Sequence, residues 1–205
     1  MNHIFRFLAV LFLAALPISL PAQNPDLLDE LYDTFAKHCV VMDCTFSVES
    51  DGIPVKGKCE VEVQGTSYTM KGGGLEIFCN GESVWILDPE SMEAVIEPVT
   101  NDSYSYMTNP ALLFRDIDKM FSKAGSSALS DSGKRYRLTA REACGVASAV
   151  LDIDKNAVLK RAEFTLDDDS VMTIEVKSVK AQPMKESAAF RPGQMPSDWV
   201  VTDLR

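Results

Sequence analysis

The sequence predicts a mainly β fold with an α lid: a half-open antiparallel β-barrel of about eleven strands with two helices covering its concavity. Three observations favour this fold. Apolar and polar residues alternate with period two through most of the chain after residue 40. Tight-turn residues separate these runs, so neighbouring strands are expected to pair antiparallel. Two other segments carry apolar residues at helical spacing, and only the concave face of the sheet can bury them.

The first 22 residues have the three-part pattern of a secretory signal peptide. Arg6 precedes an apolar run at residues 7–16, which is shorter than a bilayer-spanning helix requires. Small or helix-breaking residues follow it, with cleavage expected near Ala22. No cysteine lies near that site, so we expect a soluble periplasmic protein without a lipid anchor. Residues 23–205 are expected to form a single domain.

The first helix is expected to begin at Asn24, a suitable N-cap, with Pro25 in its first turn. Its apolar stripe consists of Leu27, Leu28, Leu31, Tyr32, Phe35 and Cys39. A second helix is expected after Asn109, with Leu112, Leu113, Phe114, Ile117, Met120 and Phe121 on its apolar side. Residues 126–133 are expected to be a flexible link.

Strands are expected wherever the alternation has period two or a short apolar run lies between turns. They cover residues 42–48, 55–64, 68–71, 75–79, 84–87, 92–99, 135–140, 146–153, 158–166, 171–180 and 199–203. Asn80-Gly81 is the strongest hairpin signal in the chain. The triple glycine at 72–74 and the triple aspartate at 167–169 are expected to be bends between strands, because neither has the surroundings of a phosphate or calcium loop.

Charge and histidine content exclude several classes of function. Twenty basic and thirty acidic residues give a net charge of −10 and a pI near 4.7, which argues against nucleic-acid binding and against electrostatic docking on anionic lipid. His3 and His38 are the only histidines. Histidine-based catalysis and multi-histidine metal sites are therefore nearly excluded. We expect neither an enzyme nor a cofactor or metal protein.

Five cysteines follow residue 22, namely Cys39, Cys44, Cys59, Cys79 and Cys144. Their spacing matches no zinc module, and no CxxC motif occurs. Cys44, Cys59 and Cys79 fall on the apolar phase of strand-like segments, where cysteine acts as a small hydrophobe. This pattern favours buried free thiols, with one structural disulfide as the alternative.

Three motifs in order resemble the periplasmic outer-membrane lipoprotein carrier (LolA-like) family. Residues 80–89, Asn-Gly-Glu-Ser-Val-Trp-Ile-Leu-Asp-Pro, resemble the tryptophan hairpin of that family. Residues 109–113, Asn-Pro-Ala-Leu-Leu, are similar to the start of its lid helix. The segments 190–192, Phe-Arg-Pro, and 199–205, Trp-Val-Val-Thr-Asp-Leu-Arg, are similar to its C-terminal ending. The early-strand arginine that holds the lid in better-known members has no counterpart, since the first arginine after residue 22 is Arg115.

The resemblance implies a carrier that shields the acyl chains of lipoproteins, or other lipids, in an apolar cavity and moves them toward the outer membrane. It implies acylated cargo, an inner-membrane exporter and an outer-membrane acceptor as partners, for a chain expected to be a monomer. The alternative on the same fold is a lipid- or lipoprotein-sensing regulatory module of the envelope.

The residues expected to line the cavity come from the sheet and from both helices. On the sheet they are Met42, Phe46, Val61, Met70, Ile77, Trp85 and Ile174; on the helices they are Leu31, Phe35, Leu112, Leu113, Ile117 and Met120. For each of them alone, plain core packing is an equal alternative. Only the cavity as a whole carries the hypothesis.

Overall fold

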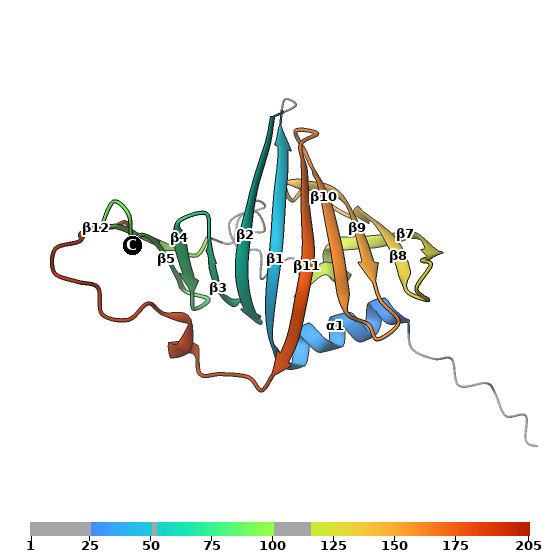
Figure 1. Ribbon diagram of the computed structural model, residues 1–205, viewed down its shortest axis with the longest axis horizontal. Coiled ribbons are helices and arrows are strands. Elements are labelled where there is room, and N and C mark those ends of the chain that lie inside the picture. The colour runs from blue at the N-terminus through green and yellow to red at the C-terminus, as the bar shows by residue number, and fades with distance from the viewer. Residues whose placement is uncertain (1–25, 51–52, 101–115) are drawn as a thin grey trace, which may run out of the picture.

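The computed structural model describes residues 26–50, 53–100 and 116–205. They form one open twelve-stranded sheet in the order β12-β6-β5-β4-β3-β2-β1-β11-β10-β9-β8-β7 (Figure 1). The strands are β1 (Cys39–Ser50), β2 (Ile53–Gln64), β3 (Ser67–Gly72), β4 (Leu75–Cys79), β5 (Ser83–Asp88), β6 (Glu93–Pro98), β7 (Phe121–Ala128), β8 (Lys134–Ala140), β9 (Val146–Ile153), β10 (Leu159–Leu166), β11 (Val171–Gln182) and β12 (Val200–Asp203). Neighbours pair antiparallel except β12, which lies parallel to β6. The mainly β architecture expected from the alternation is confirmed.

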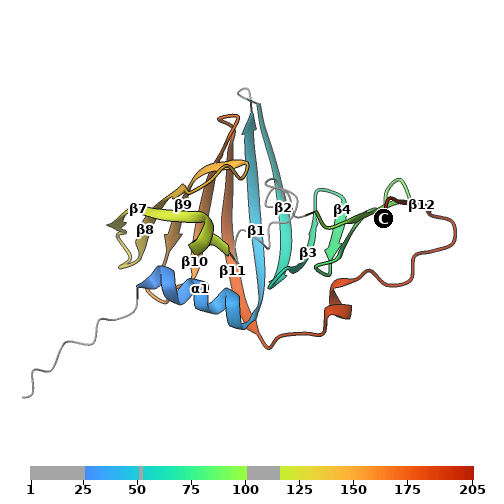
Figure 2. The ribbon, with the colours of Figure 1, turned by 180° about the vertical axis from the view of Figure 1, so that it is seen from behind.

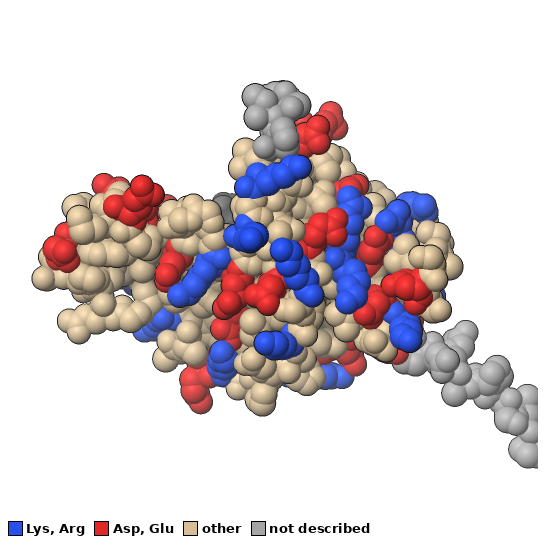
Figure 3. Space-filling model, viewed as in Figure 1, with Lys and Arg blue, Asp and Glu red and all other residues tan. Residues whose placement is uncertain are grey.

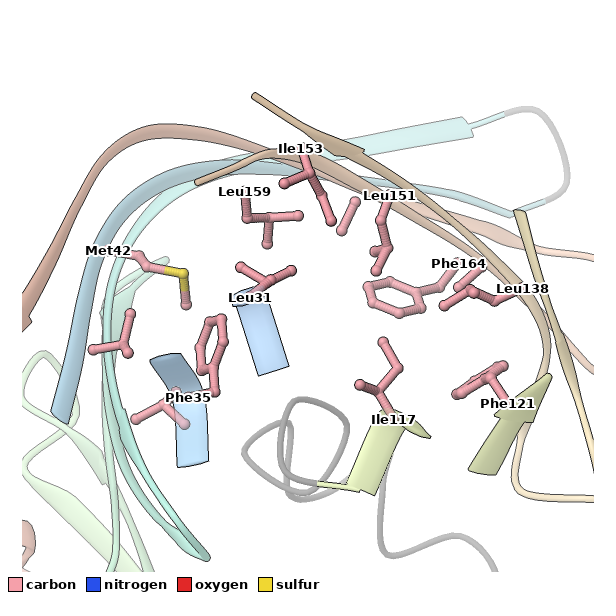
Figure 4. Close-up of a cluster of buried hydrophobic side chains, with 14 of the residues drawn as sticks. Leu31, Phe35, Met42, Ile117, Phe121, Leu138, Leu151, Ile153, Leu159 and Phe164 are labelled. Carbon is pink, nitrogen blue, oxygen red and sulfur yellow. The ribbon is translucent and has the colours of Figure 1, made fainter. Parts of the chain in front are cut away.

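Helix α1 (Leu27–Lys37) lies against one face of the sheet, which curves around it (Figures 2 and 4). This face is called the inner face below, and the opposite one the outer face. The helix turns Leu28, Leu31 and Phe35 toward the sheet, and all three are buried. Residues 116–120 are also helical, and Ile117 packs into the same interior as Phe35 (Figure 4).

Asp26, rather than Asn24, is the N-cap residue of α1, and Cys39 already belongs to β1. The carboxylate of Asp26 makes no capping hydrogen bond. It binds Lys123 and Tyr136 instead, and Lys134 lies 3.5 Å away. These contacts attach the start of α1 to β7 and β8. The N-terminal end of the helix is therefore held by ion pairs and a hydrogen bond, while its apolar side is held by packing on the sheet.

The segment after the second helix differs from the prediction. Phe121 was expected on the helix and residues 126–133 in a flexible link, but residues 121–128 form strand β7, paired with β8. Its sequence, Phe-Ser-Lys-Ala-Gly-Ser-Ser-Ala, contains a single large apolar residue. Strand β7 lies at the edge of the sheet and pairs only with β8. Main-chain hydrogen bonds to β8 therefore hold it in the sheet, although it has no apolar face.

The C-terminal segment covers the outer face of the sheet at its other end. After β11 a short helix, η1 (Ser187–Phe190), buries Phe190 completely. Met195 and Trp199 then pack against the cluster that contains Trp85. The guanidinium of Arg191 lies 5.9 Å from the centroid of the Trp85 ring. The hairpin and C-terminal motifs, more than 100 residues apart in sequence, therefore meet in space.

The turns expected from sequence are confirmed at three places. Asn80 accepts hydrogen bonds from the N–H groups of Glu82 and Ser83 between β4 and β5. The triple glycine turns between β3 and β4, with positive φ at Gly73 and Gly74. Asp168 accepts a hydrogen bond from the N–H of Ser170 in the turn between β10 and β11.

Substitution of Gly72 by alanine is expected to lower the free energy of unfolding by about 1–3 kcal/mol. A Cβ atom at Gly72 would lie 2.4 Å from the carbonyl oxygen of Lys58 and 2.8 Å from the Cβ of Cys59, so the backbone of β2 would have to move. Urea unfolding would measure the change. Gly125→Ala is the matched control, since a Cβ there meets nothing within 4 Å. Equal stability of the two variants would contradict this close approach.

Candidate functional site

The inner face continues across four strands in rows of directly opposed residues. Met42 of β1 lies opposite Val61 of β2, which faces Met70 of β3, which in turn faces Ile77 of β4. Residues directly opposed on antiparallel strands point to the same face of a sheet. One apolar row therefore runs along the inner face from β1 to β4.

A second row on the same face lies farther from α1. Phe46 of β1 is opposite Ile174 of β11 on one side and Gly57 of β2 on the other. The Phe46 ring lies over Gly57, where an added Cβ would come within 2.6 Å of two ring carbons. Met172 and Val48 form the next row outward. This part of the surface is thus apolar, and the ring of Phe46 occupies the space that a side chain at position 57 would fill.

Burial divides the inner face into two zones. Under α1 and residues 116–120 the side chains form a packed core, in which Met42 is 2% exposed and Leu31 and Phe35 are 4% exposed. Beyond this cover the inner-face residues are only half-buried. We call these residues the inner strip: Phe46, Met70, Ile77, Met172 and Ile174. Methionine and isoleucine without full cover are suited to contact a flexible apolar ligand.

Of the thirteen residues expected to line the cavity, the structure brings ten together on the inner face or on the helices that cover it. Val61, Ile117, Leu31, Phe35 and Met42 belong to the packed core, and Met120 is half-buried against it. Phe46, Met70, Ile77 and Ile174 belong to the inner strip, and Leu112 and Leu113 lie outside the described residues.

The prediction that Trp85 lines the inner cavity is wrong. Trp85 lies opposite Phe78 of β4 and Ile96 of β6, on the outer face, in a separate cluster under the C-terminal segment. Its neighbour Val84 packs on the inner side instead. Strand β5 alternates correctly, but both of its faces are covered, so its apolar run does not indicate which phase points inward.

Several inner-face residues were missed by the sequence analysis. Tyr68 and Phe164 are each 1% exposed and belong to the same core as α1. Tyr68 follows a polar turn, yet its register opposite Val63 and Cys79 fixes it on the inner face. The alternation along residues 158–166 places Phe164 on one phase, which is the signal that could have found it.

The outer face of the central strands is polar and carries charges of both signs (Figure 3). Arg161 contacts Glu163 at 2.6 Å and Glu175 at 2.9 Å, and Arg135 contacts Asp152 at 2.6 Å. A hollow of about 450 Å³ on these strands is lined mostly by outer-face side chains, among them Lys56, Lys58 and Glu175. On the central strands, the large apolar side chains therefore lie on the inner face.

Within the described residues, no group of three or more histidine, cysteine, aspartate or glutamate side chains could hold a metal ion. No helix in that part of the chain is long and apolar enough to cross a membrane. His38 is exposed at the C-cap of α1.

The carboxyl group of Asp26, at the start of α1, has a strongly shifted pKa. Partial burial by itself raises the pKa of this carboxyl group. The hydrogen bonds from Lys123 and Tyr136 and the charges of Lys123 and Lys134 outweigh that effect and hold the pKa at about 2, below its ordinary value of 3.8. The ionised form of Asp26 is therefore stabilised in the folded protein.

The variant Asp26→Asn is expected to lose about 1–2 kcal/mol of folding free energy near pH 7, less than the full pKa shift because the site is partly solvated. A depressed pKa contributes stability above the unfolded pKa of 3.8 and loses it as the pH falls through about 2. Urea unfolding at pH 7 and pH 3 should therefore show a smaller difference between parent and variant at the lower pH. Asp29→Asn, at an exposed position of the same helix, is the control, and a difference independent of pH would contradict the assignment.

Comparison with solved structures finds similar chains at low sequence identity. A LolA superfamily protein from Nitrosomonas europaea is 11% identical, with a TM-score of 0.44 over 80% of this chain and 96% of that chain. A putative outer membrane lipoprotein-sorting protein domain from Vibrio parahaemolyticus is 6% identical, with a TM-score of 0.43 over 80% and 95% of the two chains.

The structure of the Pseudomonas aeruginosa MucA/MucB complex also matches, at 10% identity and a TM-score of 0.36, over 85% of this chain and 65% of that chain. No family model and no curated protein matches the sequence.

Proposed function

We propose that this protein is a periplasmic carrier that binds the acyl chains of lipoproteins, or of other lipids, on the inner face of its sheet and moves them toward the outer membrane. The observation that carries the proposal is the inner strip. Phe46, Met70, Ile77, Met172 and Ile174 form a half-buried apolar surface beyond the cover of α1. The signal-peptide pattern of residues 1–22 supports the periplasmic location.

Shielding an acyl chain requires surface rather than chemistry. Each methylene group left in water costs on the order of 0.8 kcal/mol, so a chain of ordinary length gains several kilocalories per mole by contact with an apolar wall. The curved sheet offers such a wall on its inner face, while the outer face of its central strands is polar. The helices beside the strip would act as a lid over the bound chain.

The direction of transport and the partners rest on the sequence resemblance. The hairpin, helix-start and C-terminal motifs support a carrier that receives acylated cargo from an inner-membrane exporter and delivers it to an outer-membrane acceptor. A sensing module on the same fold would bind the same acyl chains but would deliver nothing.

Mass spectrometry of the protein purified from periplasm tests the proposal. We expect acylated lipoproteins or lipids to co-purify and to be released by organic extraction. A fluorescent fatty-acid probe should also bind saturably and be displaced by a diacylated lipopeptide. Protein that carries no acylated species and binds neither ligand would overturn the proposed function. Binding without transfer of cargo to outer-membrane vesicles would favour the sensing module.

A further inference from the structure

Two of the five cysteines face each other on the inner face of the sheet. Cys44 of β1 lies directly opposite Cys59 of β2, between the row of Met42 and Val61 and the row of Phe46 and Gly57. Directly opposed residues of antiparallel strands have Cβ atoms about 4.5–5.5 Å apart, and a disulfide needs about 3.5–4.5 Å. An approach of roughly 1 Å therefore brings the two sulfur atoms into bonding geometry.

The other three cysteines have other partners. The thiol of Cys39 donates to the Glu62 carboxylate at 2.9 Å, and that of Cys144 donates to the Val146 carbonyl at 3.4 Å. Cys79 accepts a hydrogen bond from the N–H of Gly81 at 3.4 Å, and its strand partners are Tyr68 and Val84. Because all five cysteines are described, Cys44 and Cys59 are the one pair placed opposite each other on neighbouring strands.

The pair is chemically asymmetric. Cys44 is buried, whereas Cys59 is half-buried and faces Gly72 on β3, so no side chain covers that flank. The interaction between the two thiols raises the pKa of Cys44 and lowers that of Cys59. A disulfide donor reaches the more exposed thiol first, so Cys59 is the attacking residue and Cys44 the resolving one.

We propose that Cys44 and Cys59 are a reversible dithiol–disulfide pair that cross-links β1 and β2 in the wall of the inner face. The Cys59 thiolate attacks one sulfur of a disulfide donor, forms a mixed disulfide and releases one donor thiolate. The Cys44 thiol then loses its proton, its sulfur attacks that of Cys59, and the second donor thiolate leaves. Two protein thiols and one donor disulfide become one protein disulfide and two donor thiols. In this structure the pair is in its reduced form.

The cross-link closes a loop of about 15 residues, from Cys44 to Cys59, which contains the C-terminal part of β1 and the N-terminal part of β2. These are two of the longest strands, and they carry Phe46 and Gly57 of the second inner row. Oxidation would fix the spacing of the two strands beside the inner strip, without changing its apolar surface. From the loop length we expect the melting temperature to rise by roughly 5–10 °C on oxidation.

Peptide mapping of the parent protein tests the proposal without any variant. The full chain is equilibrated with oxidised glutathione, the remaining thiols are alkylated under denaturing conditions, and the protein is cleaved with trypsin. We expect a mass loss of about 2 Da, the mass of two hydrogens, and a linked pair of peptides spanning residues 38–56 and 59–71. Since residues 38–56 also contain Cys39, the Cys39→Ala variant must give the same link.

Variants separate the cross-link from ordinary packing. Cys44→Ser and Cys59→Ser, checked for folding by circular dichroism, should lose the mass change and any redox-dependent shift in melting temperature. Cys79→Ser, which removes a thiol as buried as that of Cys44, should keep both. Five alkylated thiols in the parent after oxidation, or a link that involves Cys39, Cys79 or Cys144, would overturn the proposal.

Discussion

Replacement of Phe35 by alanine is expected to lower the free energy of unfolding by about 3–5 kcal/mol. Phe35 is 4% exposed and lies in the core between α1 and the inner face, close to Met42 (Figure 4). Its removal leaves a cavity that the surrounding strands fill only in part, because their main-chain pairing holds them in place. Urea unfolding followed by circular dichroism would measure the loss.

The matched control for Phe35→Ala is Lys37→Ala on the same helix. Lys37 is exposed and pairs with Asp33 at 2.6 Å, an interaction worth about 0.5 kcal/mol or less at the surface. A loss of less than about 1 kcal/mol for Phe35→Ala would show that α1 does not depend on the inner face for its stability.

Replacement of Ile174 by glutamate is expected to weaken binding of an acyl probe at least about 30-fold while the protein remains folded. Ile174 belongs to the inner strip and is half-buried, so a glutamate there stays hydrated in the free protein. A bound acyl chain would cover the carboxylate without offering a hydrogen-bond donor, and that desolvation opposes binding. Titration of a fluorescent fatty-acid probe would measure the change in affinity.

Thr173→Glu is the control for Ile174→Glu, because Thr173 is the next residue of β11, is also half-buried and points to the outer face. It introduces the same charge on the same strand. If both variants bind the probe as the parent does, the inner strip is not the acyl site; if both lose binding equally, the effect is one of net charge.

Much of the fold could be predicted from residue spacing, because the curved sheet has one apolar face. The alternation at Met42 and Phe46 on β1, and at Val61 on β2, already gave their shared face, and the register confirms it. The stripe of Leu31 and Phe35 likewise predicted the buried side of α1. The local alternation is enough to predict which residues share a face where one face of a strand is buried and the other is exposed to solvent.

The predictions were wrong where contacts between residues far apart in sequence decide which face a side chain points to or whether a segment is a strand. Trp85 was placed on the inner face because a nearly continuous apolar run does not show its phase, and the C-terminal segment that buries its other side is about 100 residues away. Strand β7 was missed because pairing with β8, not apolar content, determines it. The contact of Asp26 with Tyr136 joins residues 110 apart, a separation that no local motif reports.

Isoleucine methyl NMR with a spin-labelled fatty acid tests the central claim most directly. The described strands place Ile77, Ile86 and Ile174 on the inner face and Ile96 on the outer face. A spin label on the bound acyl chain should broaden the methyl resonances of Ile77 and Ile174 and leave that of Ile96 sharp. Broadening of Ile96 without Ile77 and Ile174, or a spectrum unchanged at saturating fatty acid, would contradict an acyl site on the inner face.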